Sequence, residues 1–182
     1  MKVISVNIGD KKIVTWKNRV YKTGMFKYPV DGSIYLGEEN VLNDHVIDRR
    51  FHGGIDKAVY AYGKNHYAYW KNLYPDLEFN YGMFGENLTI DSLNEDEIFV
   101  DSIYQLGETK IQVTKPREPC VKLGIRFKDA KVIKQFWNTT KSGVYFKVIE
   151  TGKVTKNDVL LLLKKRINTP SIADVYKSKK AI

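Results

Sequence analysis

The chain has 182 residues, 43% of them hydrophobic and 28% charged, which is enough for one ordinary domain with a sizeable core and at most a small appendage. It has one cysteine, which excludes an internal disulfide framework, and no apolar run near the ~18 residues of a membrane span, so we expect a cytoplasmic protein without membrane insertion. The net charge of +9 fits nucleic acid, an anionic membrane, a phosphorylated ligand or only a lysine-rich proteome, and does not choose among them.

The first part of the chain alternates between short strands and polar loops. Strand-like patterns recur at residues 1–8, 12–16, 32–36 and 41–47. The first two are separated by a Gly-Asp pair and are expected to form a hairpin. Residues 21–30 carry Lys22 and Lys27, which indicates either a loop that presents cations to a ligand or a solvated turn.

A glycine pair, Gly53-Gly54, lies among cations and is a candidate ligand site. Paired glycines permit positive φ and let a ligand approach backbone N–H groups, as anion-binding nests require. Arg49, His52 and Lys57 add positive charge beside the pair. The spacing matches neither a Walker loop nor a dinucleotide fingerprint. The alternative is a tight turn in which His52 only forms hydrogen bonds.

The middle of the chain predicts a strand at 58–62 and a helix at 66–73, on which His66 is expected to be structural. Residues 81–87 then form a glycine-shaped loop before an apolar strand. Asn87 in this loop is expected to bind either the backbone or a ligand.

The only cysteine, Cys120, follows a strand predicted at 110–114 and stands in the sequence KPREPC. Each proline withholds a backbone donor and keeps its predecessor extended, so Cys120 is expected just past the strand end. Neighbouring cations, among them Arg117 and Arg126, would stabilise a thiolate, the form that acts as nucleophile or soft-metal ligand. The alternative is a small buried hydrophobe without chemistry.

The last part predicts a helix at 129–137 and a hairpin formed by residues 144–149 and 159–163. Ser171 and Asp174 have the spacing of a capping box that starts a short final helix. Many short strands with Gly-rich turns predict a mainly β fold, a closed or nearly closed β-barrel with a few helical insertions.

Several motifs occur in an order and spacing that match one known family. They are KTGMFKYPV at 22–30, DRRFHGGIDKAVYAY at 48–62, HYAYW at 66–70, FGENLT at 84–89 and KPREPCVKL at 115–123. Together they resemble the YiiM-like family of MOSC-domain proteins, in the molybdenum cofactor sulfurase C-terminal domain superfamily. The likeness covers nearly the whole chain, and the Arg-x-Pro-Cys element is its most telling part. One mild departure is Asn157-Asp158, where the family has a Gly-Asp turn.

The resemblance implies a MOSC β-barrel of the pyruvate-kinase-barrel-like type over residues 1–166. Longer relatives carry a three-helix C-terminal subdomain, and residues 167–182 resemble only its first helix. A homodimer, and any redox-partner contact that needs that subdomain, therefore remain open.

The resemblance also implies that the chain binds molybdenum cofactor, a molybdenum ion held by the dithiolene of a phosphorylated molybdopterin. Cys120 would be the protein ligand to the metal, and a soft thiolate suits that role. His52 or Asp56 would relay protons. The residues expected to receive the phosphate and pterin groups are Lys22, Lys27, Arg49, His52, Gly53, Gly54, Lys57, Asn87, Arg117 and Arg126.

The activity implied is the reduction of N-hydroxylated small molecules, such as hydroxylaminopurine-type bases, with electrons from a separate flavin or haem reductase. One alternative is a carrier that holds molybdenum cofactor or sulfur without turnover. Another is a basic β-barrel that binds nucleic acid. Against the last, the cations cluster in glycine and proline loops and do not alternate with stacking aromatics.

Overall fold

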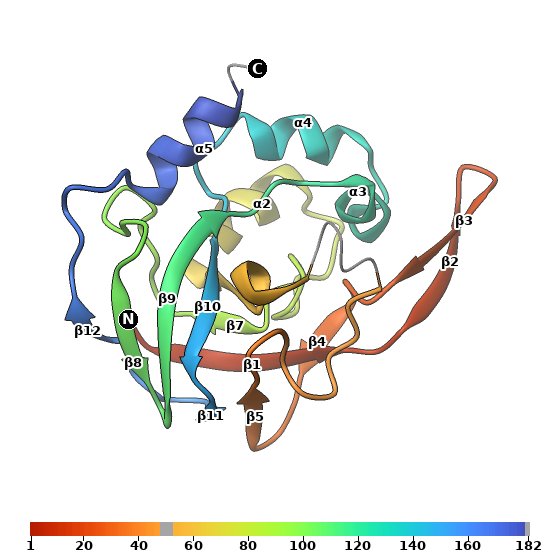
Figure 1. The fold of residues 1–182 in the computed structure, drawn as a ribbon. Helices are drawn as coiled ribbons and strands as arrows, with labels where there is room; N and C mark the ends of the chain where they lie inside the picture. Colours follow the sequence, from red (N-terminus) through yellow and green to blue (C-terminus); the bar gives the residue numbers. More distant parts are fainter. Residues whose placement is uncertain (48–52, 181–182) are drawn as a thin grey trace.

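The computed structural model describes residues 1–47 and 53–180 and is mainly β, as expected (Figure 1). Its strands are β1 Val3–Gly9, β2 Lys12–Trp16, β3 Arg19–Thr23, β4 Lys27–Pro29, β5 Ser33–Leu36, β6 Val59–Gly63, β7 Leu88–Ile90, β8 Ile103–Leu106, β9 Thr109–Pro116, β10 Val144–Glu150, β11 Gly152–Thr155 and β12 Leu161–Lys164. Its helices are α2 Tyr67–Leu73, α3 Val121–Phe127, α4 Lys131–Trp137 and α5 Ile172–Lys180, with short 3₁₀ turns η1 Ile55–Lys57 and η2 Lys64–His66. None of these helices has the length and apolar character needed to span a bilayer.

One curved sheet forms the body of the molecule (Figure 1). It has eight strands in the order β12-β8-β9-β10-β6-β7-β1-β4, and only β6 and β7 pair in parallel. Within the described residues the two edge strands, β12 and β4, do not pair with each other, so the expected closed barrel is not found. Two smaller sheets are paired separately: β5 with β11, which packs against the same core through Ile34, Leu36 and Val154, and β2 with β3.

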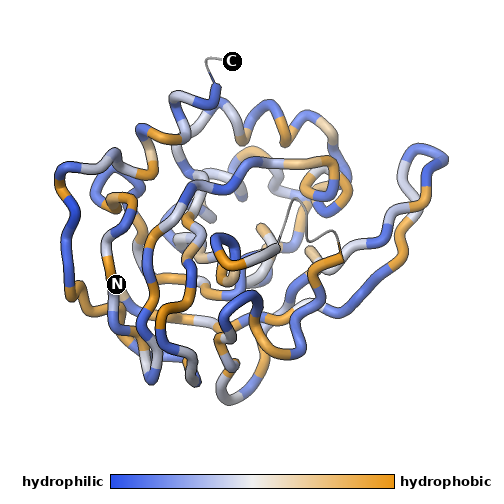
Figure 2. The backbone as a smooth tube through the Cα atoms, viewed as in Figure 1, coloured by the Kyte–Doolittle hydropathy of each residue, from blue (hydrophilic) through white to orange (hydrophobic). Residues whose placement is uncertain are grey.

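The alternation of apolar and polar residues sets which face of each strand is buried. In β9, Ile111 and Val113 are fully buried, while Lys110, Gln112 and Thr114 on the opposite face are half-buried. A strand with one face on the core requires this alternation. Figure 2 shows this alternation along the strands. Every residue of β6 is buried, because this central strand is covered on both faces.

The helices cover a second, aromatic core on one side of the sheet. The rings of Trp70 in α2 and Phe136 in α4 stack 5.6 Å apart, and the Trp70 Nε1–H donates to the Tyr62 hydroxyl at 2.7 Å. In α5, the ring of Tyr176 is fully buried and stacks on Trp137. The final helix is therefore packed into the molecule.

Two local predictions near helix starts are confirmed. The Ser171 hydroxyl donates to the Asp174 carboxylate at 2.7 Å and accepts from the Asp174 N–H, which is the predicted capping box. His66 is structural: its Nε2 lies 2.9 Å from the buried carboxylate of Glu95, which also accepts from the Gly143 N–H.

The strand pairings differ from the expected hairpins. β2 pairs with β3 through a two-residue turn at Lys17-Asn18, and both turn residues have the positive φ of a type I′ turn. β1 is thereby left to pair with β4 and β7. Near the other end, β10 pairs with β6 and β9, and β12 pairs with β8. Residues 41–47, expected as a strand, form a loop with a single bridge at Val41.

Candidate functional site

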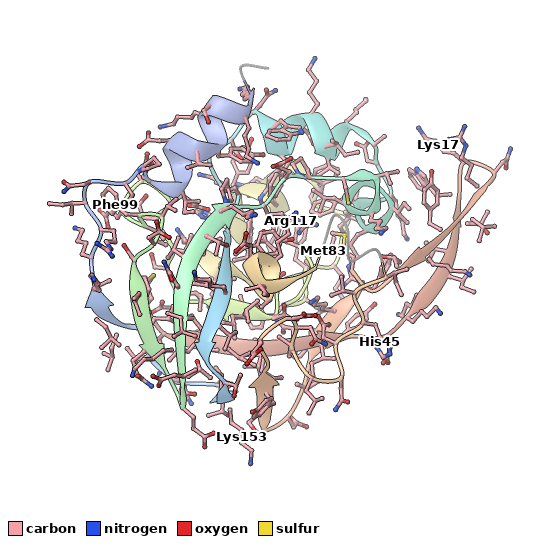
Figure 3. The ribbon with its side chains drawn as sticks, in the orientation of Figure 1. Lys17, His45, Met83, Phe99, Arg117 and Lys153 are labelled. Carbon is pink, nitrogen blue, oxygen red and sulfur yellow. The ribbon has the colours of Figure 1, made fainter. Side chains whose placement is uncertain are left out.

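A pocket lies where the loops after β3, β5 and β9 meet. It encloses about 600 Å³, open solvent at its mouth included. Its walls come from residues 23–25, the loop 44–47, the strand β6, the residues before β7 and the segment that contains Cys120. Figure 3 places Arg117 toward the interior of the molecule and His45 on the lower side.

The structure brings together about half of the residues predicted for the site. Those that line the pocket are Lys27, Lys57, Asn87, Arg117 and Cys120. Those outside its lining are Lys22, Gly53, Gly54, Asp56 and Arg126. Arg49 and His52 lie outside the described residues. The predicted residues that line the pocket are thus the cysteine, two lysines, one arginine and one asparagine.

Cys120 is held by the prolines and by the start of α3. β9 ends at Pro116, and Cys120 keeps an extended backbone as the residue just before the first turn of α3. Its carbonyl accepts from the Leu123 N–H at 2.9 Å. The side chain is half-buried and lines the pocket. Cys120 is therefore not enclosed in the core, and a chemical role for its thiol stays a prediction.

Arg117 is buried, with 5% of the residue exposed, yet its guanidinium lacks a carboxylate partner among the described residues. The guanidinium carbon lies 5.1 Å from the centre of the Tyr60 ring, and Nη2 approaches the Met25 sulfur at 3.5 Å. Nη1 is buried without a hydrogen-bond partner. A buried polar atom left unpaired is rare and indicates a missing partner or a functional role.

The surrounding phenols leave the charge of Arg117 uncompensated at neutral pH. Burial raises the pKa of Tyr60 well above its ordinary value and also raises the pKa of Tyr145, so both remain uncharged. Burial lowers the pKa of Arg117, and Tyr60, Tyr145 and Cys120 raise it overall, but the two tyrosines do so only at the high pH at which they are deprotonated. The pocket therefore contains a fixed positive charge with a free donor.

Lys27 and Asn87 belong to a closed hydrogen-bond network around Asp44. The Lys27 ammonium and the Asn87 Nδ2 both donate to the Asp44 Oδ2, and the Gly9 N–H donates to the other oxygen at 2.9 Å. Asn87 also binds the backbone of Asn7 and Tyr60. Burial lowers the pKa of Lys27, although Asp44 opposes that shift. These side chains frame the pocket, which favours the backbone role of Asn87.

Two other cations line the pocket. Lys57 and Lys122 line it from η1 and α3, respectively, and both are half-buried. Burial lowers the pKa of Lys57, and the nearby charge of Lys115 lowers it further. Both side chains would reach an anionic group placed beside Cys120.

The predicted residues outside the lining have other contacts. The Asp56 carboxylate is 61% exposed and pairs with Lys115 at 3.3 Å. Arg126 lies over the rings of Phe26 and Tyr28 and donates to the Tyr28 hydroxyl at 2.9 Å. Lys22 is exposed on β3. A proton relay at Asp56 remains a prediction without a place in the pocket.

Asp44, Tyr60 and Tyr145 are among the pocket residues that sequence reasoning missed. Tyr60 lies in a strand that was predicted correctly, but nothing in AVYAY distinguishes a core tyrosine from one that supports an arginine. Asp44 was hidden in a segment predicted to be a strand. Its signal is the Asn-Asp pair, residue types that favour loops over strands.

Comparison with known families shows to which family the chain belongs. The family described as the MOSC domain matches residues 48–161, which include the glycine pair and Cys120. The chain belongs to the MOSC family. The predicted family is thus confirmed, and about half of the pocket lining, Arg117 and Cys120 included, lies within the matched residues.

The relatives of this MOSC chain include proteins of bacteria and fungi. It is 34% identical to the uncharacterized protein YflK of Bacillus subtilis and 35% identical to the protein YiiM of Escherichia coli. These matches cover 88% and 83% of this chain and 72% and 70% of the relatives. A Gibberella moniliformis protein named "Reductase" is 31% identical over 85% of this chain, but the match covers only 28% of the fungal protein.

Solved structures share the fold. The crystal structure of YiiM from Geobacillus stearothermophilus matches with a TM-score of 0.81 and 31% identity, covering 98% of this chain and 83% of the other. YiiM from Escherichia coli matches with a TM-score of 0.77 and 28% identity, covering all of this chain and 79% of the other. The YiiM-like fold of this MOSC chain is therefore established.

The pocket of the MOSC chain suits the molybdenum cofactor with which MOSC domains are associated. The described residues contain no cluster of three or more His, Cys, Asp or Glu able to hold a metal ion by themselves. A single thiol instead fits a metal that arrives with an organic ligand of its own. The unpartnered Nη1 of Arg117, with Lys57 and Lys122, fits the anionic part of such a ligand.

Proposed function

We propose that this chain binds molybdenum cofactor in the pocket and reduces N-hydroxylated small molecules, such as hydroxylaminopurine-type bases. The electrons come from a separate flavin or haem reductase. The observation that carries the proposal is the pairing, in one pocket, of the lone cysteine with a buried guanidinium nitrogen that has no partner. The homologue named as a reductase supports the reaction class.

Each pocket residue has a distinct part in this function. The Cys120 thiolate ligates the metal, because a soft sulfur ligand suits molybdenum. Arg117 donates from Nη1 to an anionic oxygen of the cofactor, and its position is fixed by the ring of Tyr60. The Tyr60 hydroxyl donates to the Ser142 carbonyl at 2.8 Å, which holds that ring in place.

When bound, the molybdenum centre supplies the two-electron reduction of the N–O bond. The chain supplies orientation and charge. Lys57 and Lys122 in the pocket lining attract anionic groups, while the network of Lys27, Asp44 and Asn87 keeps the wall rigid. Rigid, pre-oriented donors of this kind stabilise developing charge without reorganisation.

The test measures cofactor content and turnover separately. The protein is purified from a cofactor-producing host beside Cys120→Ser and the matched surface control Lys153→Ser. Molybdenum is measured by elemental mass spectrometry and the pterin by fluorescence after oxidation. The unmodified chain and the control are expected to hold both, and Cys120→Ser to lose molybdenum.

Turnover is then measured with 6-hydroxylaminopurine and reduced viologen, with the product purine base quantified by chromatography. We expect reduction by the unmodified chain and loss of at least tenfold in Cys120→Ser, because the metal is lost. A chain that holds the cofactor but reduces no hydroxylamine would be a carrier. Absence of molybdenum and pterin even after incubation with free cofactor would overturn the proposal.

A further inference from the structure

The β2–β3 hairpin projects from the body of the molecule (Figure 1), and Thr23 at its end lines the pocket. Its strands pair only with each other, and Lys17 lies at its tip (Figure 3). We call residues 11–23 the arm. A two-stranded hairpin is marginally stable alone, so the arm must gain stability from its base or from a partner.

The arm carries an unusual charge. It contains five cations, Lys11, Lys12, Lys17, Arg19 and Lys22, and no aspartate or glutamate. None of the five forms an ion pair with a described residue. Figure 2 shows the hydrophilic tip of the arm at its far end. Lys12 is half-buried over the rings of Phe26 and Tyr28, and the other four cations are exposed. The positive charge of the arm therefore has no acidic counterpart and faces mainly solvent.

Apolar side chains stand between these cations. Ile13 and Val20 are 65% and 68% exposed, and the strand register places both on one face, beside Thr15 and Lys22. The other face carries Trp16 and Tyr21, which are half-buried. Exposed apolar and aromatic residues within a basic surface are the composition of a protein interface centre with a charged rim.

The base of the arm is fixed to the pocket wall. A Cβ atom on Gly24 would lie 1.5 Å from the His45 carbonyl oxygen, and one on Gly9 would lie 2.4 Å from the Gly24 carbonyl oxygen. The His45 N–H also donates to the Gly9 carbonyl at 3.0 Å. Since His45 and Gly24 line the pocket, a partner held on the arm lies next to the pocket opening.

We propose that the arm docks the acidic face of the redox protein that supplies electrons to the pocket. This inference rests on the proposed function, which requires a separate electron donor. A basic arm with exposed apolar residues complements an acidic flavoprotein in charge and offers it a small apolar contact. Charge pairing of this kind accelerates association and makes its rate depend steeply on salt.

The test compares two electron sources for the cofactor-loaded protein. One is reduced viologen, a small molecule that needs no docking surface, and the other is reduced flavodoxin, an acidic flavoprotein. The arm variant is Lys11→Glu/Lys17→Glu/Arg19→Glu. The matched control, Lys153→Glu/Lys156→Glu/Lys164→Glu, changes the net charge equally at exposed positions on β11, the following turn and β12, away from the arm.

We expect the arm variant to keep its molybdenum content and viologen-driven rate, and to lose on the order of tenfold or more in the flavodoxin-driven rate at low salt. The control should lose far less. Binding of oxidised flavodoxin, measured by titration calorimetry without turnover, should weaken in the arm variant alone.

The outcomes separate this inference from the proposed function. Equal flavodoxin-driven rates in the arm variant and the control, or binding of a single-stranded oligonucleotide by the arm in preference to flavodoxin, would overturn docking alone. Viologen-driven turnover without any flavodoxin-driven turnover in the unmodified chain would also overturn it. No turnover with either reductant would overturn the proposed function and the docking that rests on it.

Discussion

The buried charge of Arg117 should lower the free energy of unfolding of the cofactor-free chain. Replacement of Arg117 by methionine tests this. The guanidinium is buried with no carboxylate partner among the described residues, and one of its nitrogens donates to no acceptor. Arg117→Met keeps an unbranched side chain of similar length beside Tyr60 and removes the charge. The sign of the change in the free energy of unfolding therefore depends on two contributions: the desolvation cost that the substitution removes and the stacking on Tyr60 that it loses.

The magnitude follows from two opposing contributions. Burying a charge costs several kcal/mol after relaxation, and stacking on a desolvated ring returns about 2 kcal/mol, so we expect Arg117→Met to raise the free energy of unfolding by about 1–3 kcal/mol. With a urea m-value of about 2 kcal/mol/M, the unfolding midpoint should rise by roughly 0.5–1.5 M. Cofactor affinity should fall, by about 10- to 100-fold for one lost charge-assisted hydrogen bond.

Arg126→Met is the matched control. Arg126 also lies over aromatic rings and has one buried unpaired nitrogen, Nε, but it is only half-buried and its Nη atoms donate to the Tyr28 hydroxyl and the Lys27 carbonyl. Its loss should lower the free energy of unfolding by about 1 kcal/mol. If urea unfolding of the cofactor-free proteins showed Arg117→Met to be as destabilised as Arg126→Met, the interpretation of Arg117 as an uncompensated charge would be refuted.

Three further predictions concern the frame of the pocket and the last helix. Gly24→Ala forces the pocket loop to move and is expected to cost about 3 kcal/mol in thermal unfolding. The control Gly124→Ala in α3, whose Cβ would keep ordinary contact distances of 3.4 Å or more, should cost little or nothing; equal costs would contradict the packing. Ser171→Ala removes the confirmed cap of α5 and should cost about 1 kcal/mol, with no change expected for Ser178→Ala at the other end of the helix as a control. Burial lowers the pKa of Lys27 in the folded chain. Between this lowered pKa and 10.5, the unfolded chain therefore binds more protons than the folded chain does. Stability should then rise with pH through this window, and urea titrations from about pH 8 to pH 10 should show a smaller rise in Lys27→Gln.

The local elements could be predicted better than their pairing. The alternation at residues 110–114 and the cap at Ser171 each act within a few residues, so both were found from sequence. The pairing of β10 with β9 joins segments some 30 residues apart and depends on the packing of two faces of the sheet. The competition at the N-terminus was decided by the Lys17-Asn18 turn, whose backbone matches the twist of the strands better than the Gly-Asp pair.

The loop 41–47 shows why part of the pocket was hidden. Its apolar residues Val41, Val46 and Ile47 favour a strand, and local patterns alone gave that prediction. Residues distant in sequence hold these residues in a loop. The Asp44 carboxylate accepts hydrogen bonds from Gly9, Lys27 and Asn87, which lie in three other segments. A residue whose partners are all remote leaves no periodic signal.

Arg117 and Arg126 show the same limit for function. Both are arginines beside the cysteine in sequence, both were predicted to bind the cofactor, and both contact aromatic rings in the fold. Arg126 lies outside the pocket lining and donates from its Nη atoms to the Tyr28 hydroxyl and the Lys27 carbonyl, while its Nε is buried without an acceptor. Arg117 faces two phenols that burial keeps uncharged, so its donor is left for a ligand. The chemistry of the pocket therefore depends on which arginine the fold places in the pocket lining with an unpaired nitrogen, and residue type and spacing do not encode that choice.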